Sequence, residues 1–317
     1  MAENEEKTFE NFSKLPSKTR MRIIDKMAPD VRCRLTRCSK LCSKEAKRSK
    51  NYIYELGFEC DPFSITITVR YGKSNRLHGF VLIFERALGQ KWKVCKSGSR
   101  QTLWEDELDN STNLLRYAMQ EFWNLLKSFQ NNIKSLYISV AYYAIPSDFV
   151  ENIKNLRNLE HLSVTGAFDI RQIFSKLRQP LKTLFVKALG RNAHIENCEQ
   201  LYQVQQRLDL SCVNFDNSQF FRLTAKTVDI PIGQLTEKDI LKFIRNWQNG
   251  TVGKKIVSYA WNLRGSNFRV HKLLELLRVK NLKSYSAFIE IKHFNEFGKS
   301  ALLFVSRNLL EFDTELE

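Results

Sequence analysis

The sequence predicts an α/β protein in which a small N-terminal helical module precedes a β-meander and an irregular repeat solenoid. Three observations favour this fold class. Residues 14–55 have helical apolar spacing, residues 60–104 change to the alternating period of strands, and residues 133–317 repeat a short strand-like motif. With 317 residues, of which 43% are hydrophobic, the chain can bury a sizeable core.

The N-terminal module is expected to contain three short helices. Residues 1–13 are polar and should form a flexible N-terminus, and helical spacing starts after Leu15-Pro16-Ser17, where Ser17 can act as a cap. Ala28-Pro29-Asp30 ends this helix, and Asp30 can cap the second. A third, basic helix is expected over residues 44–50. Such a small module is marginal alone, so it should lean on a partner or on the next domain.

The next segment, residues 60–132, predicts a β-meander and a helix. Strand candidates rich in β-branched and aromatic residues occur at 64–69, 80–84 and 91–95, with glycines between them. Residues 112–130 then predict an amphipathic helix. Its apolar face comprises Leu115, Ala118, Phe122, Leu125, Leu126 and Phe129.

The C-terminal part repeats an L-x-x-L-x-(L/V/I) motif. Copies begin at residues 133, 159 and 181, and weaker copies occupy 207–210, 227–230, 256–259 and 282–285. The anchors Leu136, Leu162, Leu184, Leu208 and Val228 are 26, 22, 24 and 20 residues apart. This motif and period are typical of leucine-rich repeats, whose units bury their apolar edges against each other. The usual asparagine after the strand is missing, so the expected solenoid is irregular.

Helices are expected between some of these strands. Candidates lie at residues 147–156, 169–177 and 236–248. The third has the clearest signals, because Thr236 can cap it and Gly250 can end it.

The N-terminal module resembles an F-box. The resemblance rests on Leu15-Pro16, the apolar helix through Ile23-Ile24 and Met27, and Leu35 shortly before Cys38-Ser39-Lys40. A tryptophan often follows this Ser-Lys step by two residues, and Cys42 occupies that position here. The downstream chain looks like the F-box-associated domains of nematode F-box families, most clearly over residues 235–250.

This resemblance implies a substrate-recruiting adaptor of a Skp-cullin-F-box ubiquitin ligase, without catalytic residues of its own. The module would dock on a Skp-type adaptor, and the C-terminal domain would bind a target protein. Docking in a groove needs accessible apolar side chains. The predicted adaptor-binding residues are Leu15, Pro16, Ile23, Ile24, Met27 and Leu35. The alternative is that these residues form the module's own core.

Target binding is expected on the strand-lined face of the repeats, where repeat proteins usually bind. The candidate residues alternate with the apolar anchors. They are Tyr137, His161, Ser163 and Phe185. Several of them could instead be ordinary solvated strand residues.

The chain is basic, with a formal net charge of +16, and residues 14–50 supply +10 of it. This charge suits an acidic protein partner. It also leaves open an alternative function, a helix-turn-helix that places Arg32, Arg34 and Arg37 against nucleic acid. The turn lacks the usual glycine and the charges surround the helices, which disfavours that alternative.

No enzyme, cofactor or metal pattern is recognisable. The sequence contains no P-loop, G-x-S-x-G or H-E-x-x-H motif, and its five histidines are far apart. Cys33, Cys38 and Cys42 lack the paired spacing of a zinc site. Seven scattered cysteines, with no signal peptide and no apolar stretch of membrane-spanning length, predict a cytoplasmic or nuclear protein without membrane contact.

Overall fold

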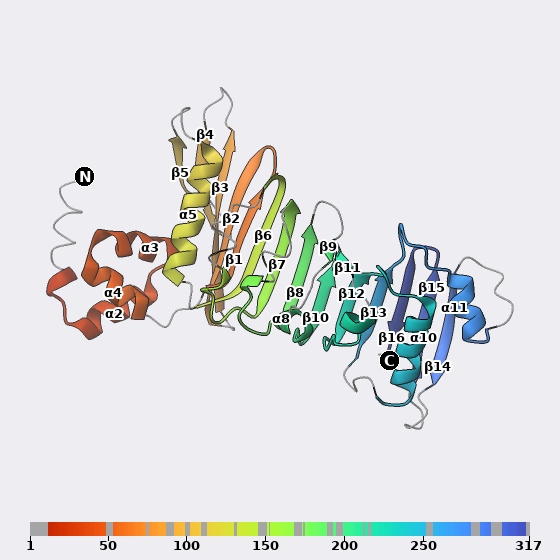
Figure 1. Cartoon of the computed structure of the whole chain (residues 1–317). Helices are drawn as coiled ribbons and strands as arrows, with labels where there is room; N and C mark the ends of the chain where they lie inside the picture. The colour runs from red at the N-terminus through yellow and green to blue at the C-terminus, as the bar shows by residue number, and fades with distance from the viewer. Residues whose placement is uncertain are drawn as a thin grey trace. The chain divides into compact units, whose positions relative to one another are not determined.

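The chain has a mixed α/β fold with a large, mostly open β-sheet (Figure 1). The computed structural model describes residues 12–48, 53–73, 76–86, 92–98, 102–108, 113–129, 132–144, 151, 153–167, 173, 175–188, 193–194, 199–211, 213–214, 217–251, 256–279, 286–292 and 300–314. The chain divides into two compact units. Unit 1 comprises residues 1–139 and 155–159, and unit 2 comprises residues 140–154 and 160–317.

Unit 1 begins with the three predicted helices, α2 (Ser17–Lys26), α3 (Pro29–Cys38) and α4 (Lys40–Arg48). Pro29 is the first residue of α3. A backbone N–H at this position has no partner within the helix, so proline loses no helical hydrogen bond there. Ser39 caps α4, because its Oγ accepts a hydrogen bond from the backbone N–H of Cys42 at 3.1 Å. The third helix therefore starts four residues earlier than predicted. The module and the meander, which the sequence analysis separated, fall within one compact unit.

Five consecutive strands of unit 1 form an antiparallel meander. They are β1 (Ile53–Cys60), β2 (Ser64–Lys73), β3 (Arg76–Arg86), β4 (Trp92–Gly98) and β5 (Thr102–Leu108). The middle three correspond to the predicted strands, whereas β1 and β5 were not predicted. Strand β6 (Ile133–Ala144) borders β1. Helix α5 (Leu114–Phe129) packs on β1 and β2, with the Phe58 and Phe122 rings 5.2 Å apart.

Unit 2 contains a ladder of parallel strands in which each strand pairs with the next long one. The ladder comprises β7 (His161–Ala167), β8 (Thr183–Ala188), β10 (Arg207–Leu210), β12 (Thr227–Pro231) and β13 (Ser258–Asn262). The predicted anchors Leu162, Leu184, Leu208 and Val228 are direct register partners, and Tyr259 continues their row. The repeat pattern therefore predicted the strand alignment correctly over these four copies.

The parallel ladder ends at β13, where the last strands add an antiparallel extension. These are β14 (Ser286–Lys292), β15 (Ser300–Ser306) and β16 (Leu309–Asp313), in the order β13-β16-β15-β14. The predicted copy at 282–285 lies outside the described residues. The sequence analysis did not predict β15 or β16. Strands β9 (Ala193–His194) and β11 (Val213–Asn214) form a separate two-stranded parallel sheet.

The helices of unit 2 are α8 (Glu199–Tyr202), α9 (Asn217–Phe220), α10 (Glu237–Gln248) and α11 (Val270–Leu276). Helix α10 begins as predicted at Thr236, which forms a capping box with Asp239. Its Phe243 ring stacks on Tyr259 at 5.1 Å and also contacts Trp261 and Phe312. This aromatic core covers one face of the C-terminal strands. The predicted helices at 147–156 and 169–177 lie largely outside the described residues.

Candidate functional site

The predicted docking residues of the N-terminal module divide into a buried and an accessible group. Ile24 is 0% exposed and Leu35 is 6% exposed, and both belong to the module's core with Cys42. Met27 packs against that core. Leu15 and Ile23 are half-buried, and Pro16 is exposed. Ile24 and Leu35 therefore cannot contact a partner unless the module opens, whereas Met27 is only partly buried.

Two further apolar side chains on the module are more accessible than the sequence pattern suggested. Val31 on α3 is 46% exposed and Leu41 on α4 is 40% exposed. Val31 shares the helical spacing of Leu35, so spacing alone cannot separate the core residue from the exposed one. Ile24 and Leu35 therefore belong to the module's own core, as the alternative interpretation of the sequence expected. Other apolar residues of the module remain accessible.

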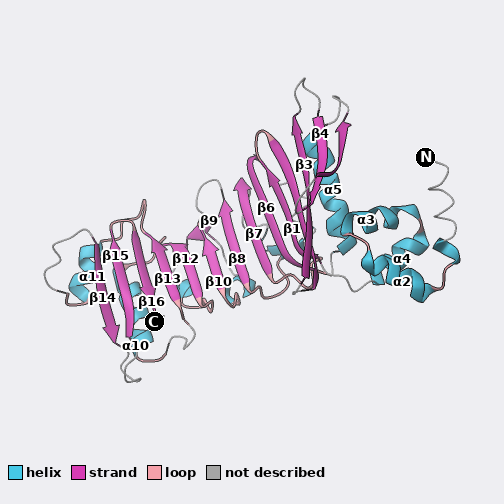
Figure 2. Ribbon diagram, turned by 180° about the vertical axis from the view of Figure 1, so that it is seen from behind, coloured by secondary structure: helices cyan, strands magenta, loops and turns pink. Residues whose placement is uncertain are grey.

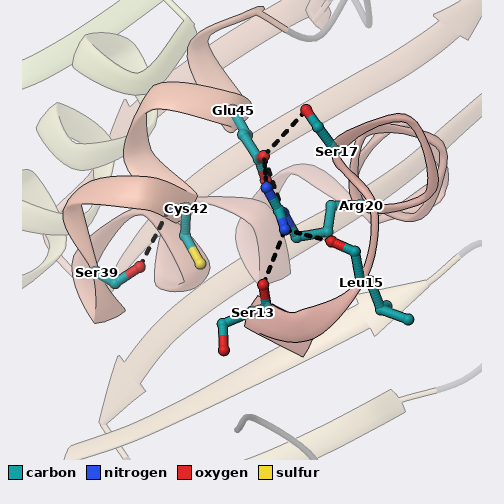
Figure 3. A network of polar contacts seen from close by, with 7 residues as sticks. All are labelled: Ser13, Leu15, Ser17, Arg20, Ser39, Cys42 and Glu45. Carbon is teal, nitrogen blue, oxygen red and sulfur yellow. Dashed lines mark hydrogen bonds and ion pairs between the residues drawn. The ribbon is translucent and has the colours of Figure 1, made fainter. Parts of the chain in front are cut away.

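The Leu15–Pro16 turn is held in place by a buried ion pair (Figure 3). The Nε and Nη2 atoms of Arg20 donate to the Glu45 carboxylate at 2.9 and 2.6 Å, and Ser17 Oγ donates to Glu45 Oε1 at 3.4 Å. The Nη1 atom of Arg20 donates to the backbone carbonyl of Leu15 and, at 2.9 Å, to that of Ser13. The hydrogen bond with Glu45 raises the pKa of Arg20 above its usual value.

This network links the segment before α2 to α4 through one guanidinium group. Glu45 is 3% exposed, so the ion pair is shielded from water on the carboxylate side. The hydrogen bonds from Arg20 to the carbonyl groups of Ser13 and Leu15 constrain this segment at the start of α2. A preorganised contact segment loses less conformational entropy when it binds a partner.

Helix α3 is attached to the rest of unit 1 by polar side chains that face inward. Asp30 forms an ion pair with Lys96 of β4 at 2.5 Å, and Arg32 lies over the Phe129 ring of α5 at 4.9 Å. Burial lowers the pKa of Arg32 to about 10. Cys33 Sγ lies 3.4 Å from Ser128 Oγ.

These contacts bear on the nucleic-acid alternative. Arg32, one of its three arginines, is 2% exposed and cannot reach a phosphate. Arg34 is exposed, and the side chain of Arg37 lies outside the described residues. Lys18 and Arg22 are also exposed, so the module retains a basic surface although its central arginine is buried.

In unit 2, three of the four predicted target-binding residues share one face of the sheet. Ser163 pairs in register with Phe185, and His161 pairs with Thr183. Phe185 is 36% exposed, and the Nδ1 atom of His161 lies 2.7 Å from Thr183 Oγ1. The fourth residue, Tyr137, belongs to unit 1.

In unit 1, Tyr137 of β6 lies beside Gly57 of β1. A Cβ atom at Gly57 would come within 3.4 Å of Tyr137 Cδ1, so the ring covers that glycine. The Tyr137 ring therefore has a structural contact within unit 1.

The sequence analysis missed two aspartates on the same face of unit 2. Asp209 and Asp229 are direct register partners on β10 and β12, and Asp209 pairs in turn with Phe185 of β8. Each follows its repeat anchor, Leu208 or Val228, by one residue. Alignment of the repeat copies would therefore have placed them next to each other. Burial raises the pKa of both carboxyls, and in Asp209 the Asp229 charge adds to this effect.

The described residues include no group of three or more His, Cys, Asp or Glu side chains that could hold a metal ion. Among the cysteines considered for zinc, Cys33 and Cys42 are buried in helices and Cys38 is exposed. No helix in the described part of the chain is long and apolar enough to cross a membrane.

The chain matches no family model, no curated protein and no solved structure.

Proposed function

We propose that the chain is a non-catalytic adaptor of a Skp-cullin-F-box ubiquitin ligase, in which the helical module docks on a Skp-type adaptor and unit 2 recruits a target protein. The observation that carries this proposal is the Leu15–Pro16 turn. It is anchored by Arg20 and Glu45, and it leaves Pro16 exposed beside a basic helix surface. An apolar contact rimmed by positive charge suits an acidic partner with an apolar groove.

In this proposal unit 2 is an irregular leucine-rich-repeat-like domain. The parallel ladder, with its anchors Leu162, Leu184, Leu208 and Val228 in one row, supports that assignment. The F-box identity of the module, its ubiquitin-ligase partner and a cytoplasmic or nuclear location belong to the same proposal.

The proposal is tested by pull-down of a Skp-type adaptor with the full chain. Pro16→Ser combined with Ile23→Ser removes two accessible apolar contacts and spares Ile24, whose loss would open the core. We expect about tenfold weaker adaptor binding, because a few apolar contacts dominate such interfaces. Phe63→Ser is the matched control, since Phe63 is 83% exposed at the β1–β2 turn, outside the module.

Ionic strength separates the proposal from the nucleic-acid alternative. Apolar docking keeps the Skp-type adaptor bound at high salt, whereas contacts to phosphates weaken steeply as salt rises. The proposal would be overturned if the wild-type chain did not bind the Skp-type adaptor at any salt concentration but bound duplex DNA at low salt.

A further inference from the structure

One face of the unit 2 sheet is open. Along its strands the side chains alternate between buried and accessible positions, as in the iBiBiBi pattern of β15. The aromatic core and α10 cover the buried side of the C-terminal strands, and Figure 2 shows these strands in front of α10 and α11. We call the accessible side the open face. On it Phe185 is 36% exposed and Phe288 is 71% exposed, so large apolar side chains meet solvent there.

A row of directly paired residues crosses the open face from β8 to β15. In order it contains Phe185, Asp209, Asp229, Ala260, Glu311 and Phe304. The row is acidic in the middle and aromatic at both ends. Phe288 extends the second aromatic end, because its ring lies 4.9 Å from that of Phe304.

The carboxylates of this row are incompletely neutralised. Asp209 has an ion pair with Arg207 at 3.3 Å, but the Arg207 side chain is 61% exposed, so water screens this ion pair. Asp229 has no ion-pair partner within 4 Å among the described residues. Like charges directly opposite each other on neighbouring strands repel. The arrangement is unfavourable in the free protein, and a bound cationic group would relieve it.

The charge of this row is opposite to that of the chain, which carries +16. Three carboxylates and no basic residue occupy the row. A metal ion does not explain them, because the described residues hold no cluster of three ligands. Lysine or arginine side chains complement both parts of the row, since the cation pairs with carboxylates and also attracts aromatic faces.

The length of the row gives the length of the ligand. Five steps between strands about 4.8 Å apart separate Phe185 from Phe304, which makes about 24 Å. An extended peptide rises about 3.3 Å per residue, so about seven residues cover the row.

We propose that the open face binds an extended peptide segment of a target protein, with Lys or Arg in its middle and aromatic or aliphatic residues near its ends. As a description of the recruited target, this rests on the adaptor function proposed above. The binding itself can be measured without any ligase component.

The test is selection of short random peptides displayed on phage against the full chain. We expect the enriched peptides to combine Lys or Arg with flanking apolar residues. The strongest one, synthesised and measured by fluorescence anisotropy, should bind the Asp209→Asn/Asp229→Asn variant about tenfold more weakly. Phe185→Ser should weaken it as well. Both asparagines keep the shape of the carboxylates, and circular dichroism verifies that the variants are folded.

Glu275→Gln serves as the control. This substitution removes one carboxylate at an exposed position of α11, away from the open face. It should leave peptide binding unchanged. Enrichment without a Lys or Arg bias, no enrichment at all, or equal binding to the Asn variant overturns the inference. Loss of peptide binding with intact adaptor binding would leave the proposed function standing. Peptide binding without adaptor binding would overturn the ligase role alone.

Discussion

Asp229 is a single side chain whose ionised form costs stability in the folded protein. It is half-buried beside Asp209, and burial raises the pKa of its carboxyl above the usual value. A carboxyl whose pKa is raised on folding destabilises the folded state wherever it is ionised. Arg207 opposes this effect only in part.

We therefore expect Asp229→Asn to stabilise the protein at neutral pH, by roughly 0.5 kcal/mol for a partly solvated group. As the pH falls through the raised pKa, the folded wild type takes up a proton before the unfolded chain does. Its stability then rises relative to the variant, and the difference should vanish at acidic pH. Urea denaturation at several pH values measures this. A variant that is less stable at pH 7 would contradict the pKa argument.

Arg20 is the residue on which the proposed docking turn depends, and the sequence did not single it out among the basic residues of positions 14–50. Its pairing with Glu45, 25 residues later, brings a carboxylate from the third helix onto the segment before the first. Among many exposed cations, nothing in the sequence distinguishes the one that folds inward.

At the scale of elements, an ion pair between helix α3 and strand β4 connects the module to the meander. Asp30 and Lys96 are 11% and 9% exposed in their side chains, and the Lys96 ammonium also lies 4.4 Å from the centre of the Phe80 ring. Asp30 Oδ1 is buried without a hydrogen-bond partner among the described residues. Such pairs contribute little net stability together, but removing one partner leaves a buried charge.

A double-mutant cycle tests this connection. Asp30→Ala should destabilise the chain by about 3 kcal/mol, because it leaves the Lys96 ammonium buried without its carboxylate. Adding Lys96→Met should recover part of that loss, since methionine keeps the apolar stem and removes the charge. Lys127→Ala on the exposed face of α5 is the control and should have little effect. Strictly additive single and double variants in chemical denaturation would show that the two groups do not interact.

At the scale of the whole molecule, the module belongs to a larger unit. Its residues Asp30, Arg32 and Cys33 contact β4 and α5, while its own core is small, comprising Ile24, Leu35 and Cys42 with Phe12 and Met27 packed against it. A core of this size is marginal by itself. The module is therefore best studied within the full chain.

A fragment of residues 1–60 should be less ordered than the same residues in the full chain. We expect the amides of α3 to exchange about tenfold faster or more in the fragment, because its partners on β4 and α5 are missing. Hydrogen exchange followed by mass spectrometry compares the two directly. Equal protection of α3 in both would show that the module folds alone.

Periodicity predicted the elements well where one face of an element is buried. The anchors of β7, β8, β10 and β12, the helix α5 and the capped helix α10 follow from it. Strand β1 escaped prediction because consecutive residues Leu56, Gly57 and Phe58 are all buried, which hides the alternation. Strand β15 escaped because its accessible positions include Leu302 and Phe304, so both of its faces are apolar.

The structure separates the candidate site residues by their exposure, which the sequence could not do. Leu15, Pro16 and Ile23 are accessible as docking requires, whereas Ile24 and Leu35 have the same apolar character and are buried. The four target-binding candidates included Phe185 but not its neighbours Asp209 and Asp229. Strand pairing, and not sequence distance, decides which residues of different repeats become neighbours.

By itself, the sequence determined the mixed α/β class, the three helices of the module, the meander and the alignment of the repeat anchors. These depend on local preference and on periods within a few residues. Only the tertiary structure decided that Arg20 pairs with Glu45, that Arg32 is buried, and that Asp209 and Asp229 share an open face. These depend on segments distant in sequence that fold against each other, and the burial of a charge is a property of that assembly.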